Sequence, residues 1–381
     1  MILIKHVLTQ INKMIPVNEP LLNGNEKKYL IECIDTGWIS SEGPFIKKFE
    51  EQFASKNNRK QGIAVCNGTA ALEIAVESLG IGKGDEVIMP AFTIISCASA
   101  IIKAGAIPVL VDSEMKTWNM DVSQIEAKIT QKTKAIMVVH IYGLPVDMDP
   151  VLELAKKYKL KIIEDAAEAH GQTYKGKPCG SFGDVSVFSF YPNKLITTGE
   201  GGMILTDDIK IADRLRSLRN LCFNANKRFV HEELGWNMRM TNVQAAIGLA
   251  QLERWDESIA RKRAMGKLYT ELLKDTKHIA LPLENNNYAN NIYWVFGIIS
   301  ENHDKTAEYI MQQLGEKGIG TRPFFYPMHL QPVLKRMGLY KNESYPNAEK
   351  LYKYGFYVPS GLALTDAQIK EVAKTLKEIL N

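Results

Sequence analysis

The sequence predicts an α/β protein with a large, mixed but mostly parallel sheet, followed by a smaller α+β portion. Residues 62–206 alternate short apolar runs with segments of helical apolar spacing, a pattern typical of parallel strands joined by right-handed crossovers. Two further apolar runs, "VSVFSF" and "GMILT", follow each other with no helix between them. This pair predicts an antiparallel portion, so the sheet is expected to be mixed.

Short apolar runs predict the first strands of this sheet. In chain order they are "GIAVC", "EVIMP", "IPVLVD", "KAIMVVH" and "KIIED". Their length and their β-branched residues are typical of strands that are buried on both faces. Between them, "TAALEIAVESLG" and "DPVLELAKKYKL" repeat apolar residues at the spacing of an amphipathic helix.

The C-terminal third changes to a smaller scale. Residues 241–274 predict a long helix or a pair of helices, and "PLENNNYANN" predicts a loop. A strand in "YWVFGII", a helix near residues 305–315, a strand in "GTRPFF" and two more helices are expected to follow. These patterns predict three parts, namely an N-terminal segment (1–24), a large α/β domain (25–255) and a small α+β domain (256–381).

The composition is that of an ordinary globular protein. The net charge of +4 is spread along the chain and gives no case for nucleic-acid binding. No apolar run approaches membrane-spanning length, and the first residues, "MILIKHVLTQINK", make a poor signal peptide. The cysteines are odd in number and none has CxxC spacing, which favours a reducing, cytoplasmic location over disulfides or structural zinc. They are Cys33, Cys66, Cys97, Cys179 and Cys222.

Two motifs at strand ends are candidates for chemistry. In "FSFYPNKLITTGEGG", Lys194 follows an apolar run and precedes a glycine cluster. A lysine held at a strand end can do covalent chemistry through its amine, although a surface loop lysine is the alternative. Asn67, Gly68 and Thr69 stand at the expected start of a helix, where N–H groups and the helix dipole favour a phosphate. Capping of the helix by Asn67 or Thr69 is the competing interpretation.

The third motif is "EDAAEAHG", in which Asp165 follows an apolar run. An aspartate there can cap a helix, bind a metal or hold a protonated ring nitrogen. Glu168 and His170 lack a partner motif such as HExxH, so no metal is expected. The glycine-rich stretches do not match GxGxxG, which weakens the alternative of a nicotinamide-dependent enzyme.

Together, a phosphate-binding helix start, an aspartate and a lysine are what pyridoxal 5'-phosphate (PLP) requires. The lysine forms a Schiff base, and the aspartate keeps the pyridine nitrogen protonated so that the ring can accept electrons. A non-catalytic protein of the same fold stays open as the alternative. The intact set of Asp165, Ser189 and Lys194 argues against it.

These motifs, in this order, resemble those of the DegT/DnrJ/EryC1/StrS family of sugar aminotransferases. The resemblance runs from about residue 15 to near the C-terminus and implies the type I, aspartate aminotransferase-like fold of PLP-dependent transferases. Some relatives have histidine in place of the lysine and are dehydratases, and Lys194 argues against that activity. The segments that carry the resemblance are "GWISSEGPFIKKFE", "NGTAALEIA", "GDEVIMPAFT", "IEDAAEAHG", "GSFGDVSVFSFYPNKLITTGEGG" and "GWNMRMTNVQAAIGLAQLE".

The resemblance implies roles for residues around the cofactor. Lys194 matches the Schiff-base lysine, and Asp165 matches the partner of the pyridine nitrogen. Glu168 lies where relatives have glutamine, histidine or glutamate near the cofactor hydroxyl. The residues that match the phosphate-binding group are Thr69, Ala70 and Ser189.

Other positions bear on the ring, the partner subunit and the substrate. Relatives usually have an aromatic residue two places after Phe92 that stacks on the pyridine ring, whereas this sequence has Ile94. Either Ile94 covers the ring as an apolar lid or Phe92 is displaced to do so. Asn237 matches an asparagine that reaches the phosphate of the neighbouring subunit, which implies an obligate homodimer with shared sites. The segment expected to line the nucleotide-sugar pocket contributes Arg322, Tyr326 and His329.

The activity implied is transamination at C4 of a nucleotide-linked 4-keto-6-deoxyhexose, with glutamate as amino donor. "VNEPLLNGNEKKYL", Glu168 and "TRPFFYPMH" are most similar to family members that make GDP-perosamine. A dTDP- or UDP-linked 4-amino-4,6-dideoxyglucose of the viosamine type is the alternative product. Either amino sugar would enter glycan biosynthesis, such as that of a lipopolysaccharide O-antigen.

Overall fold

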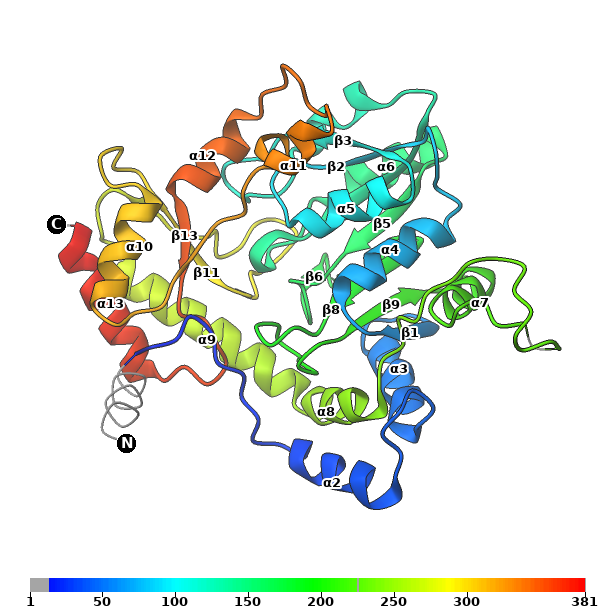
Figure 1. Ribbon diagram of the computed structural model, residues 1–381. Helices are drawn as coiled ribbons and strands as arrows, with labels where there is room; N and C mark the ends of the chain where they lie inside the picture. The colour runs from blue at the N-terminus through cyan, green and yellow to red at the C-terminus, as the bar shows by residue number, and fades with distance from the viewer. Residues whose placement is uncertain (1–13, 225, 381) are drawn as a thin grey trace.

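The computed structural model describes residues 14–224 and 226–380, so the predicted N-terminal segment lies partly outside the described residues. Figure 1 shows a large sheet with helices packed around it and a smaller helix-covered sheet beside it. The long helix α9 (Trp255–Leu273) runs from the large part into the smaller one. The predicted α/β architecture is therefore confirmed, while the domain boundaries stay a prediction.

The large sheet has the order β1-β9-β8-β5-β4-β2-β3. Within the described residues, β9 is the one strand that runs antiparallel to its neighbours, and the other pairings are parallel. The five apolar runs and the antiparallel pair predicted from the sequence are thus confirmed. The strands are β1 (Gln61–Val65), β2 (Glu86–Pro90), β3 (Ile107–Val111), β4 (Thr133–Val139), β5 (Lys161–Asp165), β8 (Val185–Ser189) and β9 (Gly202–Thr206).

Both faces of this sheet are covered by helices. The covering helices are α2 (Glu26–Thr36), α3 (Pro44–Lys56), α4 (Gly68–Ser78), α5 (Ile95–Lys103), α6 (Met148–Tyr158), α7 (Ile209–Leu218) and α8 (Asn242–Glu253). Because successive side chains of a strand point to opposite faces, each strand contributes to two cores. In β1, Ile63 and Val65 join the apolar core under α4, α5 and α7, whereas Ala64 joins the core under α3 and α8.

Residues 241–274 form a pair of helices, which decides between the two predicted alternatives. Helix α8 starts with a capping box, in which Thr241 and Gln244 satisfy each other's free N–H groups. It ends at Arg254, whose backbone is non-helical, and α9 begins at the next residue. Short elements complete the large part, namely β6 (Thr173–Tyr174), β7 (Lys177–Pro178), η1 (Val122–Gln124), η2 (Glu126–Lys128) and η3 (Ile141–Gly143).

The smaller sheet has the order β10-β11-β13-β12 and is antiparallel. The loop at "PLENNNYANN" is present, but a short strand, β10, precedes it. The prediction of two closing helices was wrong, because three helices and strand β13 follow β12. The elements are β10 (Ile279–Ala280), β11 (Phe296–Ser300), α10 (Ala307–Glu316), β12 (Arg322–Pro323), η4 (Met328–Leu330), α11 (Pro332–Arg336), α12 (Pro346–Tyr354), β13 (Gly355–Val358) and α13 (Asp366–Leu380).

Candidate active site

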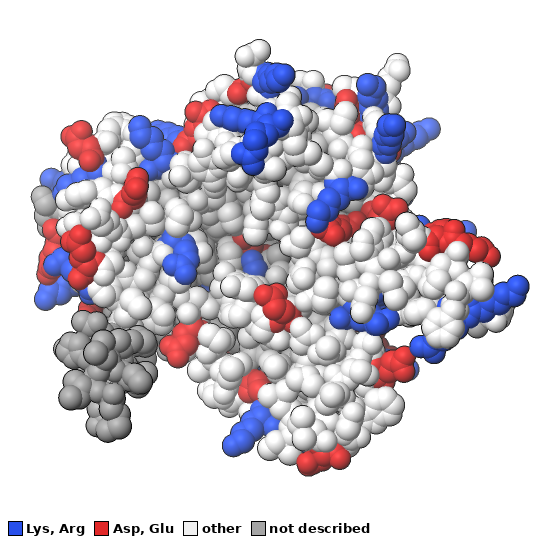
Figure 2. Space-filling model, in the orientation of Figure 1, with Lys and Arg blue, Asp and Glu red and all other residues white. Residues whose placement is uncertain are grey.

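A cavity of about 700 Å³ opens at the carboxyl ends of parallel strands, where α/β sheets bind ligands. Figure 2 shows a hollow near the middle of this face, with acidic and basic side chains intermixed around it. The cavity brings together most of the residues predicted to bind the cofactor. Those that line it are Gly68, Thr69, Ala70, Ile94, Asp165, Glu168, Ser189 and Lys194.

Lys194 lies in the loop between β8 and β9, and its side chain is only 10% exposed. This excludes the alternative of a solvated surface lysine. Its Nζ is 3.7 Å from Glu168 Oε1 and 3.8 Å from the centre of the Trp294 ring. Burial lowers the pKa of Lys194 from its usual value, although the carboxylates of Glu168 and Asp165 act in the opposite direction. The amine therefore gives up its proton more easily than a solvated lysine does.

Asp165 is the last residue of β5 and is 3% exposed. Its Oδ1 accepts a hydrogen bond of 3.0 Å from the Ala167 N–H, and its Oδ2 accepts one of 3.4 Å from the Cys97 thiol. Burial raises the pKa of this carboxyl group. A buried carboxylate with spare acceptor positions in a cavity wall is suited to a cationic N–H donor.

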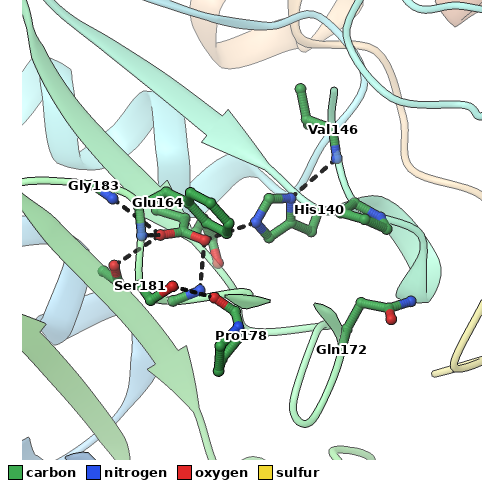
Figure 3. Close-up of polar contacts among 12 residues, drawn as sticks. His140, Val146, Glu164, Gln172, Pro178, Ser181 and Gly183 are labelled. Atoms are coloured by element: carbon green, nitrogen blue, oxygen red, sulfur yellow. Dashed lines mark hydrogen bonds and ion pairs between the residues drawn. The ribbon is translucent and has the colours of Figure 1, made fainter. Parts of the chain in front are cut away.

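The residue before Asp165 anchors the strand from the other side (Figure 3). Glu164 accepts hydrogen bonds from His140 Nε2 at 3.0 Å and from the Ser186 hydroxyl at 3.0 Å. The Val146 N–H donates to His140 Nδ1 at 3.1 Å, so Nδ1 is the acceptor of this ring and Nε2 is the donor to Glu164. The same His140 donates its backbone N–H to the Asp165 carbonyl. This network fixes the ends of β4 and β5, from which the cavity residues project.

Glu164 also accepts backbone hydrogen bonds from the loop that precedes β8. The donors are the N–H groups of Gly180 at 2.5 Å, Phe182 at 2.9 Å and Gly183 at 3.1 Å. Although burial acts to raise the pKa of Glu164, the hydrogen bonds lower it below its usual value. The carboxylate is thus a charged anchor within the sheet, and its hydrogen bonds tie β5 to the start of β8.

The start of α4 faces the same cavity. The Asn67 side chain accepts the Ala70 N–H at 2.8 Å, so the predicted alternative of a helix cap is present. The N–H groups of Gly68 and Thr69 precede the first helical hydrogen bond and are the ones available to an anion. Ala70 also lines the cavity, but its N–H already serves the cap.

Ser189, at the end of β8, lies directly beside this helix start. A Cβ added to Gly68 would come within 2.7 Å of the Ser189 Cβ, so glycine is what allows the helix start and the strand end to approach so closely. The Thr69 and Ser96 hydroxyls are hydrogen-bonded to each other at 2.9 Å. Helix N–H groups and hydroxyls thus converge on one corner of the cavity.

The backbone of η3 holds the Glu168 side chain in place. Its Oε2 accepts a 2.9 Å hydrogen bond from the Tyr142 N–H, and Tyr142 has a left-handed backbone with φ of 55°. Burial raises the pKa of Glu168, while the neighbouring Lys194 acts to lower it. Such a carboxyl group beside an amine can share a proton with it.

The structure decides between the two interpretations of the aromatic position. Ile94 lines the cavity and is 45% exposed. Phe92 is fully buried against the rings of Tyr142, Phe324 and Phe325 and is absent from the cavity wall. Of these two side chains, Ile94 is thus the one that lines the cavity.

The predicted substrate residues are not among those that line the cavity. Arg322 lies in β12 and is exposed, and the ring of Tyr326 packs edge-on against Tyr352. His329 is buried, and its Nε2 is 2.9 Å from Glu349 Oε1. The segment reaches the cavity through Phe325 instead.

Asn237 lies outside the cavity of its own chain and forms an isolated bridge with Asn220. Sequence reasoning missed other wall residues, Trp294 and Tyr357 among them. Trp294 stands in "YWVFGII", a run whose pattern predicts only a strand, and no local pattern marks this residue as functional. Among the described residues, no cluster of three or more His, Cys, Asp or Glu side chains is placed to hold a metal ion.

The chain matches the family model described as the DegT/DnrJ/EryC1/StrS aminotransferase family over residues 20–377. The GDP-perosamine synthase of Escherichia coli O157:H7 is 44% identical over 366 residues, covering 96% of this chain and 98% of the relative. The GDP-perosamine synthase of Caulobacter vibrioides is 44% identical over 373 residues, again covering 96% of this chain and 98% of the relative.

A solved structure has the same fold. The aminotransferase TlmJ of Streptoalloteichus hindustanus superimposes with a TM-score of 0.90 at 29% identity. The superposition covers 96% of this chain and 99% of that one, which confirms the predicted fold. Family profile, relatives and fold lead to the same conclusion: this chain belongs to the DegT/DnrJ/EryC1/StrS aminotransferase family.

Proposed function

We propose that this chain is a PLP-dependent aminotransferase that transfers the amino group of glutamate to C4 of a nucleotide-linked 4-keto-6-deoxyhexose. The proposed substrate is GDP-4-keto-6-deoxymannose and the proposed product is GDP-perosamine. The observation that carries the proposal is the convergence of the Lys194 amine, the Asp165 carboxylate and the start of α4 on one cavity.

The residues present fit the cofactor. The spare acceptor positions of the buried Asp165 suit a protonated ring nitrogen, and Lys194 offers a buried amine for covalent attachment. The N–H groups of Gly68 and Thr69, with the Ser189 hydroxyl, suit the phosphate. When bound, PLP supplies an electron sink that acidifies the Cα–H of the amino donor.

Lys194 would carry the proton in both halves of the reaction. In the first half its amine would take a proton from the Cα of glutamate and deliver it to the C4′ carbon of the cofactor, and in the second half it would take a proton from C4′ and deliver it to C4 of the sugar. Because burial lowers the pKa of Lys194, its amine gives up its proton and becomes a base more readily than the amine of a solvated lysine. Glu168 is close enough, at 3.7 Å, to stabilise the ammonium form that results.

The sugar-nucleotide assignment rests on the relatives. The two GDP-perosamine synthases share 44% of their residues with this chain over nearly its full length. The proposed substrate segment contains Arg322, Tyr326 and His329, and its Phe325 lines the cavity. A dTDP- or UDP-linked 4-keto-6-deoxyglucose is the alternative substrate.

We further propose a homodimer with shared sites. Asn237 lies outside the cavity of its own chain, as a residue that serves a partner's phosphate would. We also propose that the enzyme works in the cytoplasm, because all five of its cysteines are free thiols. Separately, no helix within residues 14–224 and 226–380 combines the length and apolar character needed to cross a membrane.

Two measurements test the proposal. Purified protein with added PLP should be yellow, and glutamate alone should bleach it. The bleached enzyme should then regain its colour fastest with GDP-4-keto-6-deoxymannose, in competition with dTDP- and UDP-linked 4-keto-6-deoxyglucose, and mass spectrometry should identify a 4-amino sugar. Colour recovery with none of these ketones would sink the substrate class, and preference for a dTDP or UDP sugar would sink the GDP assignment.

A further inference from the structure

Trp294 forms the cavity wall against which the Lys194 amine lies. It stands just before β11 and is 6% exposed. Lys194 Nζ is 3.8 Å from the centre of its ring, a close approach for an amine over an aromatic face. The same Nζ is also 3.7 Å from Glu168 Oε1. The amine is therefore in contact with both an indole face and a carboxyl group.

The indole is fixed at its ring and at its backbone. Its Nε1–H donates a 2.8 Å hydrogen bond to the carbonyl of Asn193, the residue before Lys194. Its own carbonyl accepts a 2.7 Å hydrogen bond from Lys262 Nζ. The ring is thus tied to the loop that carries the amine, and its backbone is tied to α9.

Lys262 is a buried lysine that the proposed reaction does not use. It is 2% exposed, and besides Trp294 it donates to the Ser360 carbonyl. Burial lowers its pKa to about 7. Burying a lysine is unfavourable unless its N–H groups find acceptors, and two backbone carbonyls fill that need here. A role of the hydrogen bond to Trp294 in the active site would explain why a lysine is buried at this position.

We propose that Trp294 is a positioning residue for Lys194, with its indole face holding the amine in place and Lys262 fixing the backbone of Trp294. This inference rests on the proposed function, because it assigns a role within the same reaction. It predicts that the size and face of the Trp294 ring govern how readily Lys194 moves a proton.

The physical reason is the charge that the amine gains. When Lys194 accepts a proton, the resulting ammonium lies over the electron-rich face of the indole, which stabilises a cation. The other titratable groups near this amine are Glu168, Asp165 and His170. Loss of the aromatic face should therefore slow proton transfer without weakening the binding of glutamate.

The test compares Trp294→Leu with Trp294→Phe in the full-length enzyme loaded with PLP. In stopped-flow bleaching by glutamate, Trp294→Leu should lower the maximal rate about tenfold, whereas Trp294→Phe, which keeps an aromatic face, should stay within about threefold of wild type. The glutamate concentration for half-maximal rate should change by less than about twofold in both. Using Cα-deuterated glutamate, the isotope effect should grow in Trp294→Leu.

A second readout does not depend on turnover. The pH at which the bound cofactor changes colour reports protonation of the Lys194 nitrogen. Without the indole face, this midpoint should fall by about 0.5–1 pH unit in Trp294→Leu, because the protonated form is destabilised. A Trp294→Leu enzyme with the wild-type midpoint and the wild-type maximal rate would overturn the proposal. So would a variant whose only change is weaker glutamate binding or lower thermal stability.

Lys262→Met tests whether the hydrogen bond from Lys262 to the Trp294 carbonyl holds Trp294 in position. Tyr269→Phe is the matched control. Tyr269 lies on the same helix, is buried, and donates its hydroxyl to the Pro359 carbonyl without bonding Trp294. Lys262→Met should shift the colour midpoint in the direction of Trp294→Leu, and Tyr269→Phe should leave it unchanged. Equal shifts in both would overturn the role of Lys262. If Lys262→Met does not fold, the two Trp294 variants still decide the proposal, and a wild-type enzyme that glutamate fails to bleach would instead sink the proposed function.

Discussion

Replacing Gly68 by alanine should weaken cofactor binding through a contact that the structure measures directly. The new Cβ would lie 2.7 Å from the Ser189 Cβ, whereas packed carbon atoms sit about 3.5–4.0 Å apart. The start of α4 and the end of β8 must then separate by about 1 Å. Because these two elements hold the groups assigned to the phosphate, their separation should misplace the donors on both sides.

The magnitude follows from the cost of overpacking. Forcing one extra carbon into a packed site costs about 1–3 kcal/mol, and each 1.4 kcal/mol corresponds to about a tenfold change in an equilibrium constant. The Kd for PLP, measured by titrating cofactor-free protein and following absorbance, should therefore rise about 5- to 150-fold in Gly68→Ala. Thermal unfolding of the cofactor-free protein should show a lower midpoint as well.

Gly315→Ala is the matched control. Gly315 lies in α10, and a Cβ there would meet no atom within 4 Å. Alanine should stabilise that helix by up to about 1 kcal/mol and leave the Kd for PLP unchanged. If Gly68→Ala bound PLP as tightly as wild type, the close approach of Gly68 and Ser189 would have no part in holding the phosphate.

Four further outcomes are expected. Lys194→Ala should keep the fold by circular dichroism but lose all bleaching by glutamate, and residual turnover would contradict the assigned role. Asp165→Asn should lower the bleaching rate far more than the unfolding midpoint, because an amide cannot keep a ring nitrogen protonated; near-normal rates would favour helix capping instead. Burial lowers the pKa of His170 to about 3. Between about pH 6.5 and pH 3 the unfolded chain binds a proton at this histidine that the folded protein does not bind. The free energy of unfolding should therefore decrease as the pH is lowered across that window, and it should decrease less steeply in His170→Phe. Co-expression of Lys194→Ala with a bulky replacement of Asn237 should restore about a quarter of wild-type activity, because half of the dimers carry one intact site; confirmed hybrid dimers without activity would rule out shared sites.

Much of the fold could be predicted because its signals are local. Buried parallel strands are continuous apolar runs, and their order along the chain alternates with helices, so "GIAVC" and "KIIED" could be placed without knowing any contact. Strand β13 could not, because Gly355–Val358 is short and gains its stability from pairing with the distant β11. The sequence does not show the break between α8 and α9 either, because neither glycine nor proline stands at the break, which falls at Arg254.

The candidate site divides in the same way. Asp165 ends β5, α4 begins soon after β1, and Lys194 lies in the loop after β8, so the topology of the sheet brings the three together. Trp294 lies just before β11 and Tyr357 lies in β13, far along the chain from Lys194, and only tertiary packing places them in the cavity wall.

The most direct test of the central claim is to identify the residue that bonds to the cofactor. Borohydride reduction of the PLP-loaded enzyme fixes the cofactor to the amine that holds it, and peptide mapping by mass spectrometry then locates the label. The account predicts a single labelled peptide containing Lys194, the lysine whose amine is buried in the cavity beside Glu168 and Trp294. A label on any other lysine, Lys262 included, or no label at all, would contradict it.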